Sequence, residues 1–311
     1  MTRPLAIGIN GIGCYLPSAR ISNLDRLELF STNESFVRNK TGFVELARKS
    51  ATDEASDLAV AAIEQLRQRT PFDLKDVDCL VVVTQNPDVH GLPHTSAIVH
   101  GKLKLSERCA AFDISLGCSG WVHGLAIVSA FMSAQGLTKG LLVTADPYSR
   151  VIQPDAKDVG MLFGDGATAT LLTDEPEWRL GRFDIGTNGS LNEALHVDHA
   201  RVLHMNGRAV FTFAATQVPG SIQRALDVNQ IAIGDVDRFI LHQGSKYILD
   251  EIARRLGIAE KSPFSSAAYG NTVSSAVPMT FVDGVKDSDK LVVVCGFGVG
   301  LSWATTVLRR D

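Results

Sequence analysis

The sequence Ala111-Phe-Asp-Ile-Ser-Leu-Gly-Cys-Ser-Gly-Trp-Val-His-Gly-Leu-Ala126 decides the fold that we expect for this chain. It begins with a short apolar run, turns at Gly117 and continues with apolar residues at helical spacing, which predicts a strand, a sharp turn and a helix. Cys118 then stands among the first helical residues. Because a helix N-terminus carries about half a positive charge, it favours the thiolate, which attacks carbonyl carbons. A buried structural cysteine is the alternative.

The order of elements around this stretch recurs in the second half of the chain. Three pairs of segments match, namely 76–84 with 235–243, 108–118 with 261–271, and 139–145 with 289–295. Such a repeat predicts two duplicated α/β halves, each with a mostly parallel sheet covered by helices. We place the halves at residues 1–172 and 173–311. Chance similarity between generic strand–helix sequences is the alternative.

The repeat also predicts where polar side chains meet. Cys118 and Asn271 fall at matching strand-to-helix turns, and His242 ends a strand beside them. Because ligands of open α/β sheets bind at the carboxyl ends of the strands, these three side chains are candidates for one site. Each also has a simpler interpretation, since a single histidine is often structural and an asparagine beside glycine often forms a turn.

Composition limits the function classes. The chain has 311 residues, 45% hydrophobic and 21% charged, with a net charge of −4, as expected of a soluble globular protein that binds neither nucleic acid nor an anionic membrane. No apolar run approaches the roughly 20 residues of a membrane span, and the first ten residues do not form a signal peptide. The five cysteines form no CxxC pair, which argues against disulfides and zinc and favours a reducing cytoplasm.

The histidines do not form a convincing metal site. His196, His199 and His204 lack a spacing that places ligands on one element, and Pro93 separates His90 from His94. We therefore expect no metal ion.

Motifs along essentially the whole chain resemble the β-ketoacyl-acyl-carrier-protein synthase III family. They are Gly11–Pro17, Asp113–Gly120, Phe163–Gly166, His242–Gln243, Tyr269–Thr272 and Gly296–Gly300, followed by Trp303. The resemblance implies the thiolase-like fold, a five-layered αβαβα arrangement of two duplicated halves with mostly parallel central sheets, and usually a homodimer. It implies no cofactor, since the coenzyme A thioester is a substrate.

The resemblance also implies a role for each candidate residue. Cys118 takes an acyl group from a thioester, and His242 and Asn271 stabilise the enolate that forms when a malonyl thioester loses CO₂. The backbone N–H groups of Cys118 and of the Gly298–Val299 turn would hold the acyl carbonyl oxygen. The resemblance further assigns substrate binding to Phe36, Lys40, Leu92, Lys157, Phe211, Ser245 and Phe297.

Several positions depart from the family pattern. Ser245 replaces an asparagine, Phe36 replaces the tryptophan that stacks on adenine, and Lys40 and Lys157 stand where arginines are typical. Lysine meets phosphate without bidentate geometry, so coenzyme A would bind differently, or the donor would be a carrier protein. Val299 stands where glycine is common, which puts the second oxyanion donor in doubt. A further departure is Leu92, which occupies the place of a phenylalanine that closes the partner subunit's acyl pocket.

Three basic residues, Lys246, Arg254 and Arg255, are candidates for docking an acidic carrier protein. The alternative is a solvated helix face on which Asp250 and Glu251 neutralise them.

The sequence therefore predicts a cytoplasmic acyltransferase that condenses an acyl-CoA primer with malonyl-CoA or malonyl-acyl carrier protein, in fatty-acid initiation or a specialised acyl or polyketide pathway. Two other functions remain open. One is transfer of the acyl group from Cys118 to an amine or hydroxyl without condensation, and the other is a non-catalytic subunit of a heterodimer.

Overall fold

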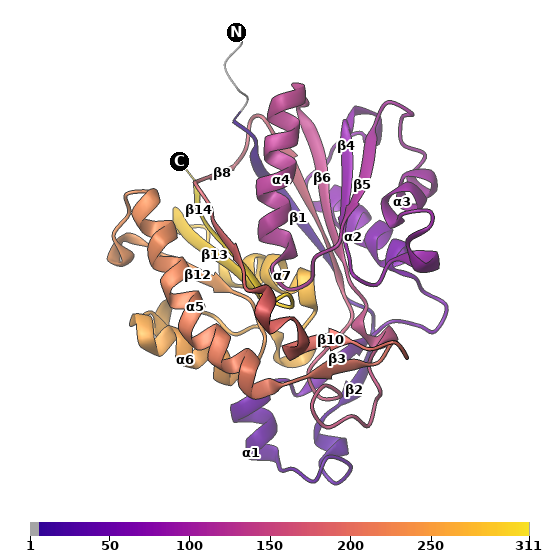
Figure 1. Ribbon diagram of the computed structural model, residues 1–311. Coiled ribbons are helices and arrows are strands. Elements are labelled where there is room, and N and C mark those ends of the chain that lie inside the picture. The colour runs from indigo at the N-terminus through magenta and orange to yellow at the C-terminus, as the bar shows by residue number, and fades with distance from the viewer. Residues whose placement is uncertain (1–5, 311) are drawn as a thin grey trace.

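Strands from both halves of the chain join one large mixed sheet. The computed structural model describes residues 6–310, and in them a ten-stranded sheet has the order β12-β13-β14-β8-β1-β7-β6-β4-β5, with β9 paired to β14 (Figure 1). β8 (Trp178–Leu180) is antiparallel to both β1 and β14 and joins the two halves.

The first half supplies five of these strands. They are β1 (Gly8–Tyr15), β4 (Cys79–Val83), β5 (Ala110–Ile114), β6 (Lys139–Ala145) and β7 (Ala167–Thr173). β4 runs parallel to β5 and β6, whereas β7 is antiparallel to β6 and β1. All of these strands except β7 therefore point the same way, as predicted. Every residue of β4 is buried, which explains its uninterrupted apolar sequence.

The second half repeats this plan with β9 (Asp184–Thr187), β12 (Arg238–Leu241), β13 (Leu291–Gly298) and β14 (Ser302–Arg309). β12 is parallel to β13, and β14 is antiparallel to β13 and β9. The predicted duplication is confirmed. The predicted division at residue 172 falls one residue before the end of β7, and the division itself stays a prediction.

One expected strand does not form. Segment 261–271, matched to the strand before Cys118, consists of loop and 3₁₀ turns at Ala259–Lys261 and Ser266–Ala268. Pro263 and a run of serine and alanine explain this, because proline cannot donate to a ladder and small residues have low strand propensity. The prediction of a strand-to-helix turn is therefore wrong at Asn271.

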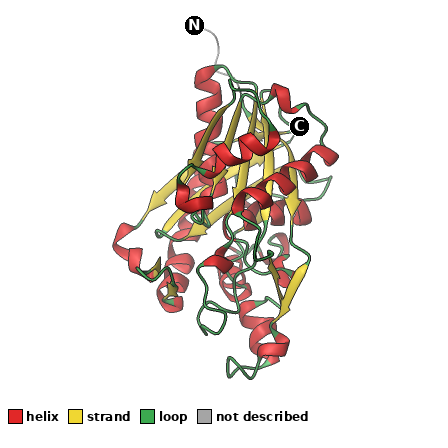
Figure 2. Cartoon of the chain, turned by 90° about the vertical axis from the view of Figure 1, so that its right-hand side faces the viewer, coloured by secondary structure: helices red, strands yellow, loops and turns green. Residues whose placement is uncertain are grey.

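Helices form three layers around the sheet. They are α2 (Ala55–Arg69), α3 (Thr95–Leu103), α4 (Gly120–Gln135), α5 (Gly207–Val228), α6 (Lys246–Leu256) and α7 (Ala276–Gly284). α2 and α3 pack on strands of the first half and α5 on strands of the second, with α6 beside α5 (Figures 1 and 2). α4 contacts β4 and β6 on one side and β13 and β14 on the other. The five-layered αβαβα arrangement is confirmed.

α4 is rich in apolar residues because strands of both halves cover its first turns. Trp121, Val122 and Leu125 have no exposed surface, and the indole N–H of Trp121 donates to Thr170 Oγ1 at 2.9 Å. Gly124 lets Leu142 approach, since a Cβ there would lie 2.7 Å from Leu142 Cδ1. The start of α4 is thereby fixed deep inside the protein.

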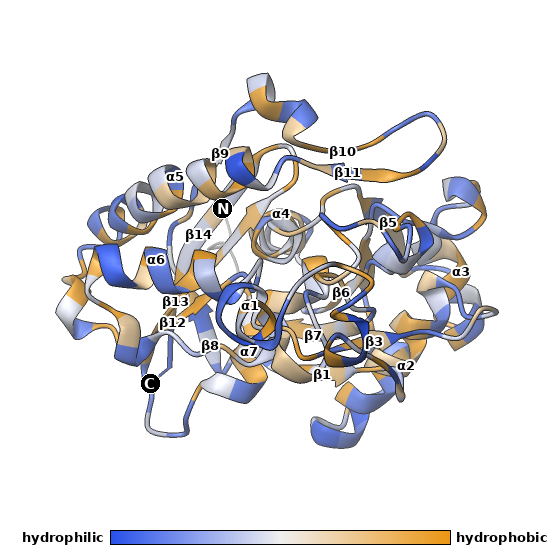
Figure 3. Cartoon of the chain, turned by 90° about the horizontal axis from the view of Figure 1, so that it is seen from below, coloured by the Kyte–Doolittle hydropathy of each residue, from blue (hydrophilic) through white to orange (hydrophobic). Residues whose placement is uncertain are grey.

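Shorter elements lie below the sheet in Figure 1. They are β2 (Ala19–Ser22), α1 (Glu34–Phe36), β3 (Glu45–Arg48), β10 (Leu195–Val197) and β11 (Leu203–Met205). Seen from below, α1 lies in front of the centre of the molecule and the β10–β11 hairpin extends to one side (Figure 3). Within residues 6–310, no helix combines the length and the apolar character that crossing a membrane requires.

Candidate active site

Cys118 lies in the turn between β5 and α4. It precedes the N-cap residue Ser119, so it stands just before the helix and not among its first residues as predicted. The side chain is 3% exposed and forms no disulfide. Its sulfur nevertheless lines a cavity of about 620 Å³, which makes it reachable by a ligand.

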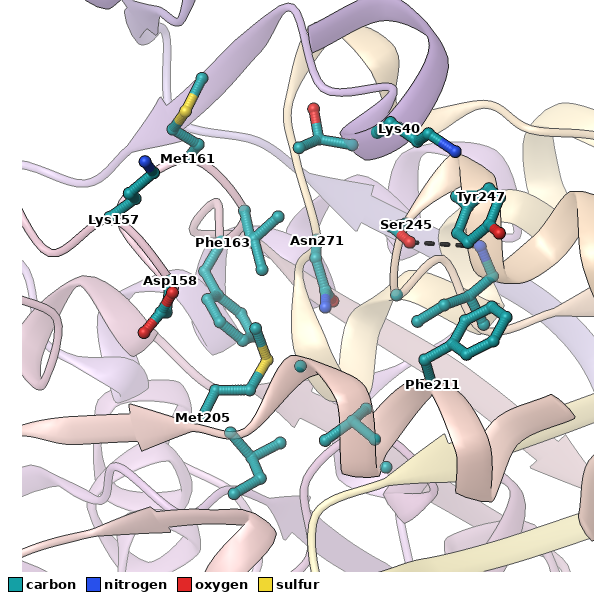
Figure 4. Close-up of a pocket in the computed structure, with 18 of the residues that line it drawn as sticks. Lys40, Lys157, Asp158, Met161, Phe163, Met205, Phe211, Ser245, Tyr247 and Asn271 are labelled. Atoms are coloured by element: carbon teal, nitrogen blue, oxygen red, sulfur yellow. Dashed lines mark hydrogen bonds between the residues drawn. The ribbon is translucent and has the colours of Figure 1, made fainter. Parts of the chain in front are cut away.

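The same cavity is lined by His242 and Asn271, from the other half of the chain. His242 follows β12 and its backbone N–H donates to Cys295 O at 2.9 Å, while Asn271 bonds through its backbone to Leu162 and Gly164. The close-up in Figure 4 places Asn271 between the walls of the cavity. The predicted convergence of the three side chains is confirmed, and their catalytic roles stay predictions.

The amide of Asn271 is oriented by its own loop. Its Oδ1 accepts the N–H of Val273 at 2.9 Å, so the cavity is offered the Nδ2 donor. Val273 has a left-handed φ of +55°, which a β-branched residue rarely adopts and which this bond helps to hold. An asparagine held in this way donates a hydrogen bond without titrating.

His242 is an uncharged ring. Burial lowers its pKa from 6.5 to about 3, so the imidazole is neutral at physiological pH and carries one N–H. Its edge meets Phe297, with ring centroids 5.5 Å apart at 86°. Nδ1 is buried with no hydrogen-bond partner in residues 6–310, which leaves Nε2 as the nitrogen for a ligand.

Burial changes the prediction for the Cys118 thiol. The pKa of Cys118 is raised to about 12, mainly by burial and to a lesser extent by the charge of Asp146, while the N–H groups of Val299 and Cys118 act in the opposite direction. The expected resting thiolate is therefore wrong, because desolvation outweighs the helix start.

The two expected oxyanion donors do face the sulfur. The backbone N–H groups of Val299 and Cys118 both lower the pKa of the Cys118 thiol, so a valine at 299 retains a backbone donor beside the sulfur. Gly298 has φ +158°, and a Cβ there would lie 2.7 Å from Cys118 Sγ. A glycine is required for β13 to approach the cysteine this closely.

Most predicted binding residues line this cavity. They are Phe36, Lys40, Lys157, Phe211, Ser245 and Phe297, with Gly298 beside them. Leu92 does not, because it is 87% exposed on a loop away from the cavity. From its position in the sequence we expect Leu92 to enter the acyl pocket of a second subunit, and this stays a prediction.

Sequence reasoning missed Tyr247 at the mouth of the cavity. Its ring stacks on Phe211 at 5.2 Å, and Lys40 Nζ lies 3.7 Å from its centroid (Figure 4). Ser245 Oγ accepts the N–H of Ile248 at 3.3 Å and so caps the start of α6. Because serine is a common N-cap residue, the sequence could have indicated that Tyr247 lies in the first turn of this helix. The apolar wall residues Met161, Leu195 and Met205 were also missed.

The candidate docking residues on α6 are neutralised. Lys246 pairs with Asp250 at 2.6 Å, and Arg254 and Arg255 both pair with Glu251, at 2.9 and 2.6 Å. This is the solvated helix face weighed as the alternative, and carrier docking there stays a prediction. Lys40 and Lys157, by contrast, form no ion pair within the described residues.

The histidines around the β10–β11 hairpin are occupied with local contacts. The rings of His196 and His204 stack at 5.6 Å, and His204 Nε2 lies 2.9 Å from Asp198 Oδ2. In the part of the chain that the structure describes, no three potential ligands gather into a metal site.

Known proteins resemble this chain over most of its length. Residues 112–189 match the family described as 3-oxoacyl-[acyl-carrier-protein] synthase III, and residues 226–310 match its C-terminal part. The β-ketoacyl-[acyl-carrier-protein] synthase III of Oceanobacillus iheyensis is 32% identical over 97% of this chain and 98% of its own.

Solved structures agree with this match. The β-ketoacyl-[acyl-carrier-protein] synthase III of Thermus thermophilus aligns with a TM-score of 0.91 at 30% identity, over 98% of this chain and 99% of that one. The priming β-ketosynthase of the R1128 polyketide pathway aligns with a TM-score of 0.90 at 26% identity, over 100% and 98%. The fold is therefore thiolase-like, and the chain belongs to the 3-oxoacyl-[acyl-carrier-protein] synthase III family of condensing enzymes.

Proposed function

We propose that this condensing enzyme joins an acyl primer, carried on Cys118, to a malonyl thioester with loss of CO₂. The observation that carries the proposal is that one cavity is lined by a thiol, a neutral imidazole and an amide donor. A nucleophile and two uncharged donors are what the two steps of such a condensation require.

The first step is acyl transfer, which makes the enzyme an acyltransferase. Cys118 loses its proton, Sγ bonds to the primer's carbonyl carbon, and the donor's C–S bond breaks. The departing thiolate keeps the electron pair and takes up a proton. The N–H groups of Cys118 and Val299 face the sulfur, where they can stabilise both the thiolate and the oxyanion of the tetrahedral intermediate.

The second step uses the other two residues. The C–C bond between the malonyl α-carbon and its carboxylate breaks and CO₂ leaves. The electron pair of that bond stays with the α-carbon and forms an enolate. Asn271 Nδ2 and His242 Nε2 donate hydrogen bonds to the enolate oxygen. The enolate carbon then attacks the acyl carbon and Sγ leaves as thiolate. A neutral His242 suits this role because it keeps the N–H without adding a charge that would titrate near neutral pH.

The cavity suits a thioester on a phosphorylated carrier. Its inner wall is apolar, whereas Lys40 and Lys157 lie on opposite sides of Asn271 at the mouth (Figure 4). These lysines would meet phosphate, and the half-exposed Phe36 offers a ring face for stacking. We assign acyl-CoA as the primer donor and malonyl-CoA or malonyl-acyl carrier protein as the extender, with no further cofactor.

We also propose a homodimer in a reducing cytoplasm. β5 ends the large sheet, and all of its residues are only half-buried, so a second copy could pair there and cover them. Leu92 would then enter the neighbour's pocket. A reducing compartment suits a nucleophile that must remain a free thiol, as all five cysteines are.

Intact-protein mass spectrometry tests the proposal. Wild type incubated with a panel of acyl-CoA esters should gain one acyl mass and lose it in a malonyl-CoA or malonyl-carrier chase that yields a β-ketoacyl product. Cys118→Ser should gain none. Equal loading of the two proteins contradicts the acyl-Cys step. Release of the acyl group only to an added amine or alcohol would assign simple transfer instead.

A further inference from the structure

The proposed steps do not use the buried carboxyl of Asp146. Asp146 follows β6 and has no exposed surface. Its Oδ1 accepts hydrogen bonds from the N–H of Gln85 at 3.1 Å and from Asn86 Nδ2 at 2.8 Å. Its Oδ2 is buried with no partner among the described residues. A carboxylate in such a position pays a desolvation penalty that protonation removes.

A short polar chain connects this carboxyl to the turn that holds Cys118. The Tyr148 hydroxyl donates to Gln85 Oε1 at 2.9 Å. A Cβ on Gly117, the residue before Cys118, would lie 2.6 Å from that Oε1 and 3.3 Å from the Tyr148 oxygen. The Tyr148 ring stacks on Phe163 of the cavity wall at 5.1 Å. The residue that donates to the carboxyl, Gln85, therefore also packs against the turn of Cys118, in a buried region where charges interact strongly.

We propose that Asp146 is a positioning residue that sets the charge state of Cys118: a neutral Asp146 permits the thiolate, and an ionised Asp146 suppresses it. The proposal rests on the proposed function only in taking Cys118 as the nucleophile. It adds a control on when that nucleophile is available.

The protonation equilibrium of Asp146 lies in the physiological pH range. Burial raises the pKa of Asp146 to about 7, although hydrogen bonds from Asn86 and Gln85 lower it. The charge of Asp146 in turn raises the pKa of Cys118. The two groups therefore titrate as a coupled pair, in which the sulfur ionises more easily while the carboxyl holds a proton.

Three buried titratable groups near this pair are neutral around pH 7, and two charged groups nearby are held by partners. Burial raises the pKa of Tyr148 well above 10 and lowers those of His123 and His242 below 6.5, so all three are neutral. Arg150 pairs with Glu54 at 2.6 Å. Asp165 accepts the N–H groups of Lys49 and Ser149. Asp146 is thus the group whose charge can switch.

The test is the rate of Cys118 alkylation by iodoacetamide from about pH 5 to about pH 9, read by peptide mass spectrometry. In wild type, the logarithm of the rate should rise with pH and bend to a lower slope near pH 7, where Asp146 ionises. In Asp146→Asn, which keeps the shape of the side chain, the rise should be straight and the rate above the bend about tenfold higher. Superimposable profiles overturn the proposal.

Tyr148→Phe is the control for loosened packing, because it breaks the bond to Gln85 and leaves the Asp146 charge in place. It should keep the bend, and loss of the bend in both variants overturns the proposal. If Asp146→Asn does not fold, as judged by its melting temperature, the wild-type profile decides: a straight line overturns the proposal and a bend supports it. Alkylation needs no substrate, so a bent profile without acyl loading contradicts only the proposed function.

Discussion

The turn that holds Cys118 and the loop that holds Asn271 occupy matching places in the two halves, yet they are built differently. Before Cys118 stands strand β5, and after it comes α4, a buried helix of 16 residues. Before Asn271 there is no strand, and α7 has only nine residues.

Each arrangement fits the group it presents. The first turn brings backbone N–H groups to a sulfur, whereas the second locks a side-chain amide through Val273. A duplicated fold can thus supply a nucleophile from one copy and a neutral donor from the other, because the fold fixes the place and the local sequence fixes the chemistry.

The largest effect should come from removing the Asn271 donor while keeping the nucleophile. Asn271→Ala should load acyl groups almost as fast as wild type but decarboxylate the malonyl thioester about a hundredfold to a thousandfold more slowly, because the enolate loses a preorganised hydrogen bond. Acyl loading and CO₂ release are measured separately. An equal loss of acyl loading and CO₂ release would show that the Cys118 turn and the Asn271 loop do not serve separate steps.

A tighter comparison uses a glycine beside each turn. Gly298→Ala would place a methyl 2.6 Å from Cys118 Cβ, so acyl loading should fall by about a hundredfold. Gly270→Ala, at φ +84°, would disturb the Asn271 loop and should affect decarboxylation more than loading. Gly189→Ala is the matched control, since nothing lies within 4 Å of its Cβ. Equal loading by Gly298→Ala and the control would argue against close contact at the sulfur.

Lysines from the two halves also differ in their partners. The ammonium of Lys40 lies over the ring of Tyr247 and forms no ion pair within residues 6–310, so it should bind phosphate, and Lys40→Ala should raise the KM for acyl-CoA by about tenfold with little change in kcat. Lys246→Ala removes a lysine already paired with Asp250 and should change KM far less. A larger increase in KM for Lys246→Ala than for Lys40→Ala would assign phosphate binding to α6 instead.

The smallest expected effect is on the pH dependence of the free energy of unfolding, which should distinguish His242 from Asn271. The native pKa of His242 is about 3 against 6.5 when unfolded, so between these values the unfolded state binds the extra proton. The free energy of unfolding should therefore fall with falling pH in this window, by at most about 1.4 kcal/mol per pH unit from this residue. Chemical denaturation of His242→Asn should show a shallower fall than wild type. Asn271→Ala should keep the wild-type slope, because an amide does not titrate.

Much of the fold was predictable from local pattern. The strand, turn and helix around Cys118 follow from short-range apolar spacing, and the duplicated halves follow from the repeated order of segments. The structure confirms both predictions. The prediction of a strand before Asn271 was wrong because the repeat was extended too far. Pro263 argues against a strand there.

The sequence by itself determined which three side chains meet and in what fold. Only the tertiary structure decided their states: that burial keeps Cys118 a thiol and His242 neutral, that Val273 orients Asn271, and that acidic neighbours neutralise α6. The reason is physical. Secondary structure follows from neighbours along the chain, whereas desolvation, pairing and hydrogen-bond orientation depend on which distant residues the folded chain packs around each group.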